Sequence, residues 1–254
     1  MEQQKYYNKL KKIVKKHKPL IWVYKIVLRF CSFINRKLMY PLINKYRLKN
    51  KLSNMDKINV GCGSDTIRGW VNLGLYSDLD IPYGTTKIIK GALVLNFDAT
   101  EDLPVGEETV KYIYASHFIE HLSFIEGISV LERFYKIMKK GGVIRLATPD
   151  LELWIKNYYE NNADFFGKYK NLCLTAEGRT LVKTKGEIFM SQVCNWGHKW
   201  NYDFESMKHI LEKIGFSQVA KKRVFESFIP DIKEIEPNEE SRILESLYVE
   251  AVKQ

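Results

Sequence analysis

Short apolar runs alternate with longer segments of helical periodicity along most of the chain. Runs with the length and composition of buried strands lie at residues 57–60, 70–76, 92–97, 111–116 and 143–147. Apolar positions at helical spacing predict helices over residues 120–139, 151–160 and 203–214. Strands that alternate with helices are typical of a parallel sheet covered by helices. We therefore expect an α/β, Rossmann-like fold with helices on both faces of the sheet.

Two later strand candidates complete the expected sheet. Residues 216–225 and 247–252 are joined by a charged loop, which favours antiparallel neighbours and a mostly parallel sheet of seven strands. Only about ten residues separate Val60 from Val71, whereas a parallel crossover usually needs about a dozen or more. We expect a shortened first crossover helix, with N-terminal helices covering the sheet there. Residues 161–200 lack a clear period and are expected to be an insertion.

The charge is concentrated at the N-terminus. The chain has 254 residues and a net charge of +10, but residues 1–51 hold fifteen Lys or Arg and only Glu2 as an acid. This local net charge of +14 leaves −4 for the rest of the chain. We expect a basic helical extension over residues 1–54 and a folded domain over residues 55–254. Such asymmetry is typical of a segment that meets an anionic partner.

The extension also contains an apolar stretch, Leu20–Ile34, with Lys25 and Arg29 in it and Arg36 just beyond. Fifteen residues are too few to span a bilayer, which takes about 20. No small-residue cleavage site follows, so a secretory signal is not indicated. The pattern predicts an amphipathic helix that lies in a lipid interface or packs on the domain. Nucleic-acid binding stays open, since Tyr and Trp are interleaved with Lys.

Candidate binding residues follow the expected strands, because open α/β sheets bind ligands at the carboxyl ends of their strands. These positions are Gly61–Ser64, Asp98, Ser116–His117 and Thr148–Asp150. Gly61 and Gly63 let the backbone approach a ligand closely. The four cysteines form no CxxC pair, which indicates reduced thiols and a cytoplasmic location.

A resemblance to one family rests on several motifs in order. V-G-C-G-S precedes F-D-A-T-E-D-L-P, Y-I-Y-A-S-H-F-I-E-H-L and K-K-G-G-V-I-R-L-A-T-P-D-L-E. From about residue 57 to 253 the chain resembles small bacterial class I S-adenosylmethionine-dependent methyltransferases, of the type 11-like branch common among predicted surface-polysaccharide enzymes. The resemblance implies S-adenosylmethionine as cofactor. It also implies O-methylation of a sugar or related polar group in capsule or lipopolysaccharide biosynthesis.

The resemblance also implies roles for particular residues. The cofactor carboxylate would meet the backbone of Gly61, Cys62, Gly63 and Ser64. Asp98 would lie beside the adenine amino group, with Ala99 as a backbone contact. Ser116 and His117 would lie near the methionine end. His121 either contacts the cofactor or hydrogen-bonds the backbone. The insertion at residues 161–200 would cap the acceptor side.

One position departs from the family. The acid that usually grips the ribose after the second strand is replaced by Gly74, in Asn72-Leu73-Gly74. Asp78 or Asp80 would have to reach back to the ribose. A methyltransferase fold that serves only as a binding or scaffold protein is therefore an alternative, as is a nucleic-acid methyltransferase that uses the basic extension.

Catalytic candidates are His117, His198 and Asp150. A competing interpretation of Asp150 is the N-cap of the helix after it, and His198 could be a structural histidine among aromatic residues. His117-x-x-Glu120-His121 matches an inverted zinc-peptidase motif, and Cys194-x3-His198 could suggest a metal site. We expect no metal, because the first motif follows a strand directly and the second is a lone pair. The expected partners are a small-molecule or glycan acceptor and an anionic membrane surface at the inner face of the membrane; the oligomeric state is left open.

Overall fold

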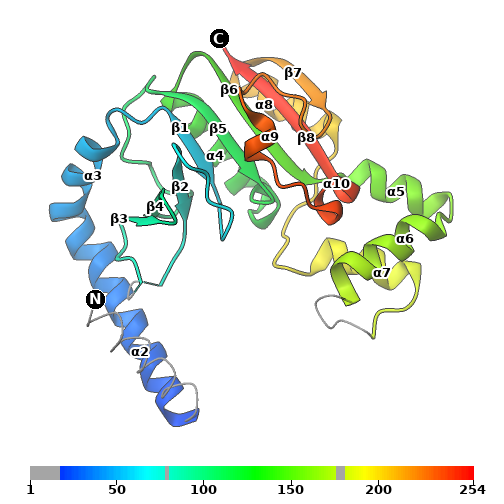
Figure 1. Cartoon of the computed structure of the whole chain (residues 1–254), viewed down its shortest axis with the longest axis horizontal. Helices are drawn as coiled ribbons and strands as arrows, with labels where there is room; N and C mark the ends of the chain where they lie inside the picture. Colours follow the sequence, from blue (N-terminus) through cyan, green and yellow to red (C-terminus); the bar gives the residue numbers. More distant parts are fainter. Residues whose placement is uncertain (1–17, 78–79, 176–180) are drawn as a thin grey trace.

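The sheet is built from eight strands, in the order β3-β4-β2-β1-β5-β6-β8-β7 (Figure 1). The computed structural model describes residues 18–77, 80–175 and 181–254. The strands are β1 (Lys57–Val60), β2 (Val71–Gly74), β3 (Thr86–Ile89), β4 (Ala92–Asn96), β5 (Val110–Ser116), β6 (Met138–Pro149), β7 (Phe216–Lys222) and β8 (Ser246–Lys253). The order β4-β2-β1-β5-β6 is that of the first five strands of a Rossmann-like sheet, with β1 beside the point where the order reverses.

The sheet has one strand more than the seven expected. The additional strand is β3, which pairs antiparallel with β4 through a turn at Lys90 and Gly91, both with positive φ. The side chains of β3 are exposed or only partly buried, because it is an edge strand. Its sequence therefore lacks the apolar run that would predict a buried strand. The last two strands are antiparallel neighbours as predicted, and β8 lies between β6 and β7.

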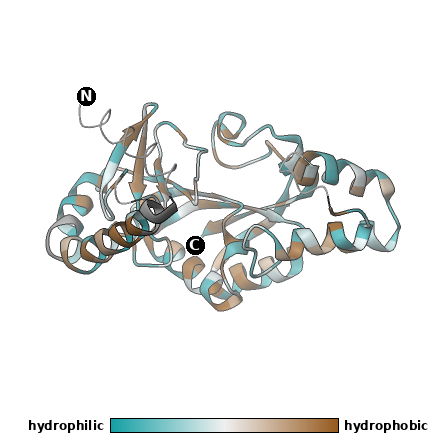
Figure 2. Cartoon of the chain, turned by 90° about the horizontal axis from the view of Figure 1, so that it is seen from below, coloured by the Kyte–Doolittle hydropathy of each residue, from teal (hydrophilic) through white to brown (hydrophobic). Residues whose placement is uncertain are grey.

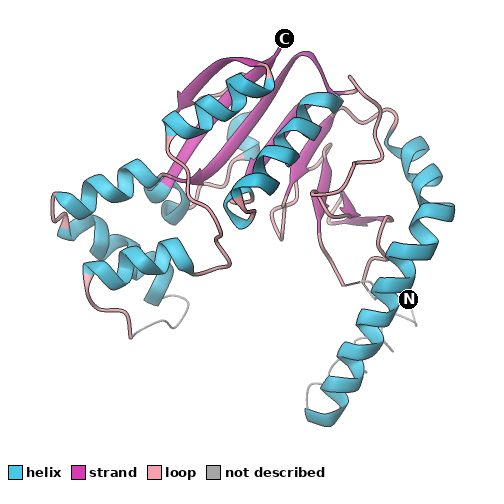
Figure 3. Cartoon of the chain, turned by 180° about the vertical axis from the view of Figure 1, so that it is seen from behind, coloured by secondary structure: helices cyan, strands magenta, loops and turns pink. Residues whose placement is uncertain are grey.

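Two amphipathic helices cover one face of the sheet (Figure 3). They are α4 (Phe124–Ile137) and α8 (Phe204–Ile214), and both bury residues in the main core. The predicted helix over residues 120–139 begins later because Ser123 forms a capping box with Glu126. The helix predicted over residues 203–214 is α8; Asp203 caps it, and Gly215 ends it in the left-handed conformation with φ of 117°.

The first crossover contains no helix at all, which corrects the expectation of a shortened one. Residues 61–70, all described, form turns, and the side chain of Asn72 holds this loop by accepting from Ile67 N at 2.6 Å. The helix α3 (Lys45–Leu52) lies on this side instead. It buries Leu48 and Leu52 in the main core.

The opposite face is covered by the chain that follows β7 rather than by long helices. Ile229 and the short helix α9 (Ile232–Ile235) lie over Tyr112 and Tyr114 of β5. Arg145 of β6 holds the segment after β7 through ion pairs and hydrogen bonds. Its guanidinium, which is fully buried, lies 2.6 Å from Glu236 and 3.1 Å from Glu250 and donates to two backbone carbonyls.

The N-terminal helix α2 (Lys18–Ile34) projects from the body of the protein, and the irregular helix η1 (Asn35–Asn44) leads from it to α3 (Figure 1). The side chains of α2 that are apolar and exposed include Val23, Ile26, Val27, Phe30 and Phe33. The ribbon of this helix is largely coloured as hydrophobic in Figure 2. Tyr40 of η1 is buried against Tyr83 and Phe97. Among the described residues, no helix is both long and apolar enough to cross a membrane.

The region between β6 and α8 forms a separate helical lobe. It contains α5 (Leu151–Tyr159), α6 (Ala163–Tyr169), η3 (Lys170–Thr175) and α7 (Lys185–Cys194). Its own core surrounds the fully buried Trp154, whose ring meets Phe165 and Tyr169 edge-on at centroid distances of 4.9 and 4.5 Å. Residues 161–200 lacked a clear period because their helices are short; of this range the structure describes all but 176–180, and the described part is largely helical.

Candidate functional site

The loop after β1 carries an open backbone surface. Gly61 and Gly63 have positive φ, of 66° and 50°. Phe118 covers Gly61 so closely that a Cβ there would lie 2.7 Å from the ring, whereas a Cβ on Gly63 would meet no heavy atom within 4 Å. In the described chain, the amides of Gly63 and Ser64 donate no hydrogen bond. Two free amides beside an open glycine suit an anionic ligand group.

A cavity of about 150 Å³ lies against this loop. Six of the predicted cofactor residues line it, namely Gly61, Cys62, Gly63, Ser64, Ser116 and His117. Because β1 and β5 are parallel neighbours, the loops after them meet at one edge of the sheet. The burial of Cys62 raises the pKa of its thiol, so it acts as an apolar wall rather than a nucleophile.

Arg242 also lines this cavity, which the sequence did not indicate. It belongs to α10 (Glu240–Glu245), and its guanidinium donates to Asp65 at 2.7 Å and to Ser116 Oγ at 3.3 Å. Its Nε lies 3.1 Å from Glu239. The C-terminal segment thus places a cation beside the glycine loop.

Tyr76 lies against Gly74, the position at which the family usually has a ribose-binding acid. Its hydroxyl donates to Gly63 O at 2.9 Å and lies 3.1 Å from Cys62 Sγ, next to Gly74. Asp78, predicted as a possible replacement for the missing acid, lies outside the described residues. Burial, first of all, raises the pKa of Tyr76, so the hydroxyl stays protonated and can donate.

Asp98 is engaged by the N-terminal segment. Its Oδ2 accepts from Arg36 Nη2 at 2.8 Å, and its Oδ1 accepts from the amide and hydroxyl of Thr100. Burial alone would raise the pKa of Asp98, but these hydrogen bonds and the Arg36 charge lower it. Neither Asp98 nor its buried neighbour Ala99 lines the cavity at the glycine loop, as far as the chain is described.

A larger cavity of about 450 Å³ adjoins the first, and His117 and Arg242 line both. Its wall comes from the sheet edge, the helical lobe and α10, and includes His121, Tyr169, Trp196, His198, Glu239, Ser241 and Glu245. Aromatic rings and polar groups converge there, as is typical of a small-molecule site. The predicted residues His117, His121 and His198 are thus brought together.

His117 stands at the end of β5 in a left-handed conformation, with φ of 49°. Its Nδ1 lies 3.1 Å from Glu120 Oε1, and its Nε2 lies 2.8 Å from Ser246 Oγ. Burial would lower the pKa of His117, but contact with Glu120 raises it above its ordinary value. The partner carboxyl of Glu120, fully buried, has a lowered pKa because His117 outweighs its desolvation. The two form a buried ion pair.

His198 is held by the backbone of the helical lobe. Its Nδ1 lies 2.7 Å from the carbonyl oxygen of Gln192, and its ring lies 5.1 Å from that of His121. Burial lowers the pKa of His198, so the ring is neutral near pH 7. With Nδ1 facing a carbonyl, Nδ1 carries the proton and Nε2 is the bare nitrogen.

Asp150 caps α5, the structural interpretation that competed with catalysis. Its carboxylate accepts from Leu153 N at 3.3 Å and pairs with Lys221 at 2.9 Å. In the described part of the chain it lines neither of the two cavities. The predicted catalytic role of Asp150 has no support in these contacts.

The zinc-peptidase arrangement is not formed. That arrangement needs both histidines on one helix, but His117 ends a strand, and Glu120 and His121 lie on the three-residue helix η2 (Ile119–His121). The side chain of Cys194 is exposed at the end of α7. Within the described residues, it belongs to no group of potential metal ligands.

No family model and no curated protein sequence matches the chain. Solved structures resemble it at low identity. An S-adenosylmethionine-dependent methyltransferase from Archaeoglobus fulgidus is 20% identical, with a TM-score of 0.45, over 82% of this chain and 92% of that one. A possible histamine N-methyltransferase from Thermotoga maritima is 18% identical, with a TM-score of 0.45, over 87% and 92%. Haemonchus contortus phosphoethanolamine N-methyltransferase 2, solved with S-adenosylmethionine, is 12% identical, with a TM-score of 0.42, over 84% and 52%. The fold of this chain is established by its own strand order.

Proposed function

We propose that the chain is an S-adenosylmethionine-dependent methyltransferase. One observation carries the proposal: an open glycine loop at the carboxyl end of β1 faces a cavity that adjoins a second, larger one through His117 and Arg242. This is the edge where open α/β sheets bind their ligands. Cofactor and acceptor would occupy neighbouring cavities, and methyl transfer depends on such alignment.

The residues at the glycine loop fit the amino-acid end of the cofactor. The free amides of Gly63 and Ser64 would hold the carboxylate, and Gly63 leaves space for it. When bound, the cofactor supplies an electrophilic methyl group on a sulfonium. Ser116 and His117 lie between this loop and the larger cavity, so they would line the path between donor and acceptor.

The proposed acceptor is a polar molecule of sugar size. The rings of Tyr169 and Trp196 offer apolar faces, while Glu239, Ser241 and Arg242 offer polar contacts. This combination suits a ligand with hydroxyl groups on an apolar ring. Together with the family resemblance, it supports O-methylation of a sugar or related group in surface-glycan biosynthesis. His198 is the candidate proton acceptor, since its neutral ring lines this cavity.

Cofactor binding by calorimetry tests the proposal directly. The wild-type chain should bind S-adenosylmethionine and its demethylated product, and Gly63→Val should abolish both interactions. Gly141→Val is the matched control: Gly141 also has positive φ and open space around it, but it is exposed near the start of β6 and lines neither cavity. Both variants place a β-branched residue at a positive φ, of 50° and 73°, and so both strain the backbone. Absence of binding by the wild type, or normal binding by Gly63→Val, would overturn the assignment.

A non-catalytic binding protein is the second candidate, favoured by the contact of Arg36 with Asp98 and by Gly74 in place of an acid. A wild-type chain that folds but binds no cofactor would support it. Turnover on RNA or protein, and none on nucleotide-linked or lipid-linked sugars, would contradict the proposed acceptor.

For location we propose the inner face of the cytoplasmic membrane. The net charge of +14 on residues 1–51 and the exposed apolar side chains of α2 support it. Basic residues near an anionic leaflet contribute on the order of 1 kcal/mol each. Arg36, just beyond the apolar stretch, pairs with the domain. Lys25 and Arg29 are exposed on α2.

A further inference from the structure

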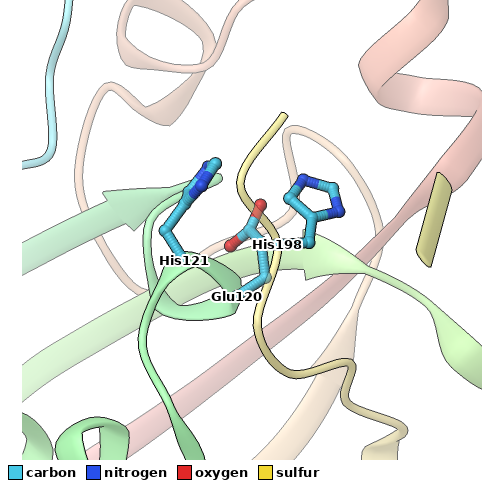
Figure 4. Close-up of side chains that lie close together, drawn as sticks. All are labelled: Glu120, His121 and His198. Atoms are coloured by element: carbon cyan, nitrogen blue, oxygen red, sulfur yellow. The ribbon is translucent and has the colours of Figure 1, made fainter. Parts of the chain in front are cut away.

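Glu120, His121 and His198 form a compact group at the wall of the larger cavity. One potential ligand atom from each lies within 4.8 Å of the others. Figure 4 shows the carboxylate of Glu120 between the two imidazole rings. His121 and His198 line the cavity itself, whereas Glu120 lies behind them and is fully buried.

Backbone hydrogen bonds bring these residues together across a large sequence separation. The amides of Lys199 and Trp200 both donate to the carbonyl oxygen of Glu120, at 2.8 and 3.2 Å. The residue before them is His198. The return of the chain from the helical lobe is thereby fastened to η2, and the position of His198 beside Glu120 and His121 is fixed by the backbone rather than by flexible side chains.

The carboxylate of Glu120 is incompletely satisfied. Its Oε1 makes no hydrogen bond of good geometry to any described residue, although His117 Nδ1 lies 3.1 Å away. Its Oε2 accepts only a long hydrogen bond, of 3.4 Å, from Thr148. Apart from its ion pair with His117, this buried carboxylate thus has few hydrogen-bond partners among the described residues, which leaves room for a further positive partner.

The outer contacts of the group are those of metal ligands. A ligating histidine usually donates its second ring nitrogen to a carbonyl or carboxylate, and ligating carboxylates are themselves contacted by polar groups. His198 Nδ1 faces the Gln192 carbonyl at 2.7 Å, which leaves Nε2 for a ligand. Glu120 likewise has an outer partner, since His117 Nδ1 lies 3.1 Å from its Oε1.

We propose that Glu120, His121 and His198 bind a divalent transition-metal cation such as Zn²⁺ or Mn²⁺. One carboxylate and two imidazoles are a ligand set that transition metals use with further positions open to water or substrate, whereas Mg²⁺ and Ca²⁺ prefer all-oxygen sites. Ligand atoms about 2.1 Å from one ion lie about 3.4 Å apart in tetrahedral geometry. The partly exposed His121 and His198 can close the remaining distance by side-chain rotation.

The open positions of the ion would face the larger cavity, because two of its ligands line that cavity. An oxygen of the cavity's occupant could then coordinate the ion. If the proposed methyltransferase function holds, this oxygen belongs to the acceptor, and the bound cation would lower the pKa of the reacting hydroxyl. His198 would then be a metal ligand through Nε2 rather than the proton acceptor. The metal site itself does not depend on that function.

The test is metal binding by the full-length, untagged chain after treatment with a chelator. Calorimetry with Zn²⁺ and Mn²⁺ should show one ion per chain, and Mg²⁺ should bind far more weakly. His121→Ala and His198→Ala should each weaken binding by more than about tenfold, the lower range seen even for outer partners of metal ligands. The visible spectrum of the Co²⁺ complex should report histidine ligation and change in both variants.

His209→Ala is the control, since His209 is exposed on α8, away from the group. Circular dichroism verifies that each variant is folded. The histidine variants are preferred to Glu120→Gln, because the two histidines are partly exposed whereas Glu120 is buried. Stoichiometric binding that survives both histidine changes, or no uptake of either transition metal, would overturn the site. Cofactor binding measured on the same samples separates this outcome from failure of the methyltransferase proposal.

Discussion

Arg36 reaches from the N-terminal segment to Asp98 at the end of β4, with 2.8 Å between Nη2 and Oδ2. The same guanidinium lies 2.5 Å from Glu101, and it stands over the ring of Tyr83 at 5.1 Å. Asp98, which was expected beside an adenine, therefore forms an ion pair that links the N-terminal segment to the domain. Any ligand that uses Asp98 must share it with Arg36 or displace it.

A double-mutant cycle measures this relationship. Arg36→Met, Asp98→Asn and the double variant should reveal a coupling free energy of about 1 kcal/mol in urea unfolding at neutral pH, the upper range for exposed ion pairs. Arg36 is about one-third exposed, at 36% of its side chain, which limits the value. Additive effects of the two changes would show that the contact does not stabilise the fold.

Arg145 should matter far more to stability. Its charge is fully buried between Glu236 and Glu250, and removing one partner of such a group leaves uncompensated buried charge. Arg145→Met should lower the free energy of unfolding by about 3–5 kcal/mol. Arg133→Met is the control, because Arg133 is partly exposed and its partner Asp102 is almost fully exposed. Equal effects of the two changes would contradict the role of the buried network.

The raised pKa of Glu245 predicts that the free energy of unfolding depends on pH. Burial raises the pKa of its carboxyl from 4.5 to about 7; Glu120 adds to this shift, while His117, Tyr169 and Arg242 oppose it. The folded state therefore favours the protonated form. Its stabilising contribution is complete below pH 4.5 and is lost as the pH rises through about 7.

Glu245→Gln should remove this dependence. Relative to the variant, the wild type should lose up to about 3 kcal/mol of unfolding free energy between mildly acidic and mildly alkaline pH. Chemical unfolding at a series of pH values provides the comparison. Parallel profiles for the two proteins would show that Glu245 has an ordinary pKa.

Membrane attachment can be examined without disturbing the core. Phe30 and Phe33 are 64% and 59% exposed, so replacing both with Ser should leave the fold intact but reduce co-sedimentation with anionic vesicles. Ile88→Ser, at a 62% exposed position on the edge strand, is the control. Salt should weaken wild-type binding, because exposed charges are screened. Deleting residues 1–51 is a poorer test, since it removes the buried Tyr40 and Leu48.

The parts of the fold that the sequence predicts are those governed by local patterns. Apolar runs located β1, β4 and β5, and apolar positions at helical spacing located α8. Edge strand β3 escaped because neither of its faces is fully buried. It forms by pairing with β4, and the composition of residues 86–89 alone does not predict that pairing.

The site divides in the same way. The glycine loop was identified because its conformation is encoded by Gly61 and Gly63 themselves. Arg242 could not be identified, since its partner Asp65 is 177 positions away in sequence. The engagement of Asp98 by Arg36 was equally invisible, because a basic run near a chain end predicts a solvent or membrane contact more readily than an ion pair within the domain.

The helical lobe leaves and rejoins the sheet at almost the same point. Asp150 and Tyr202 form a β-bridge, and Leu151 N donates to the carbonyl oxygen of Tyr202 at 2.9 Å. The described residues between them have a core of their own around Trp154. Because its two ends meet, the lobe can change in length and in lining during evolution without disturbing the sheet or the glycine loop. Such changes would alter which molecule the larger cavity admits.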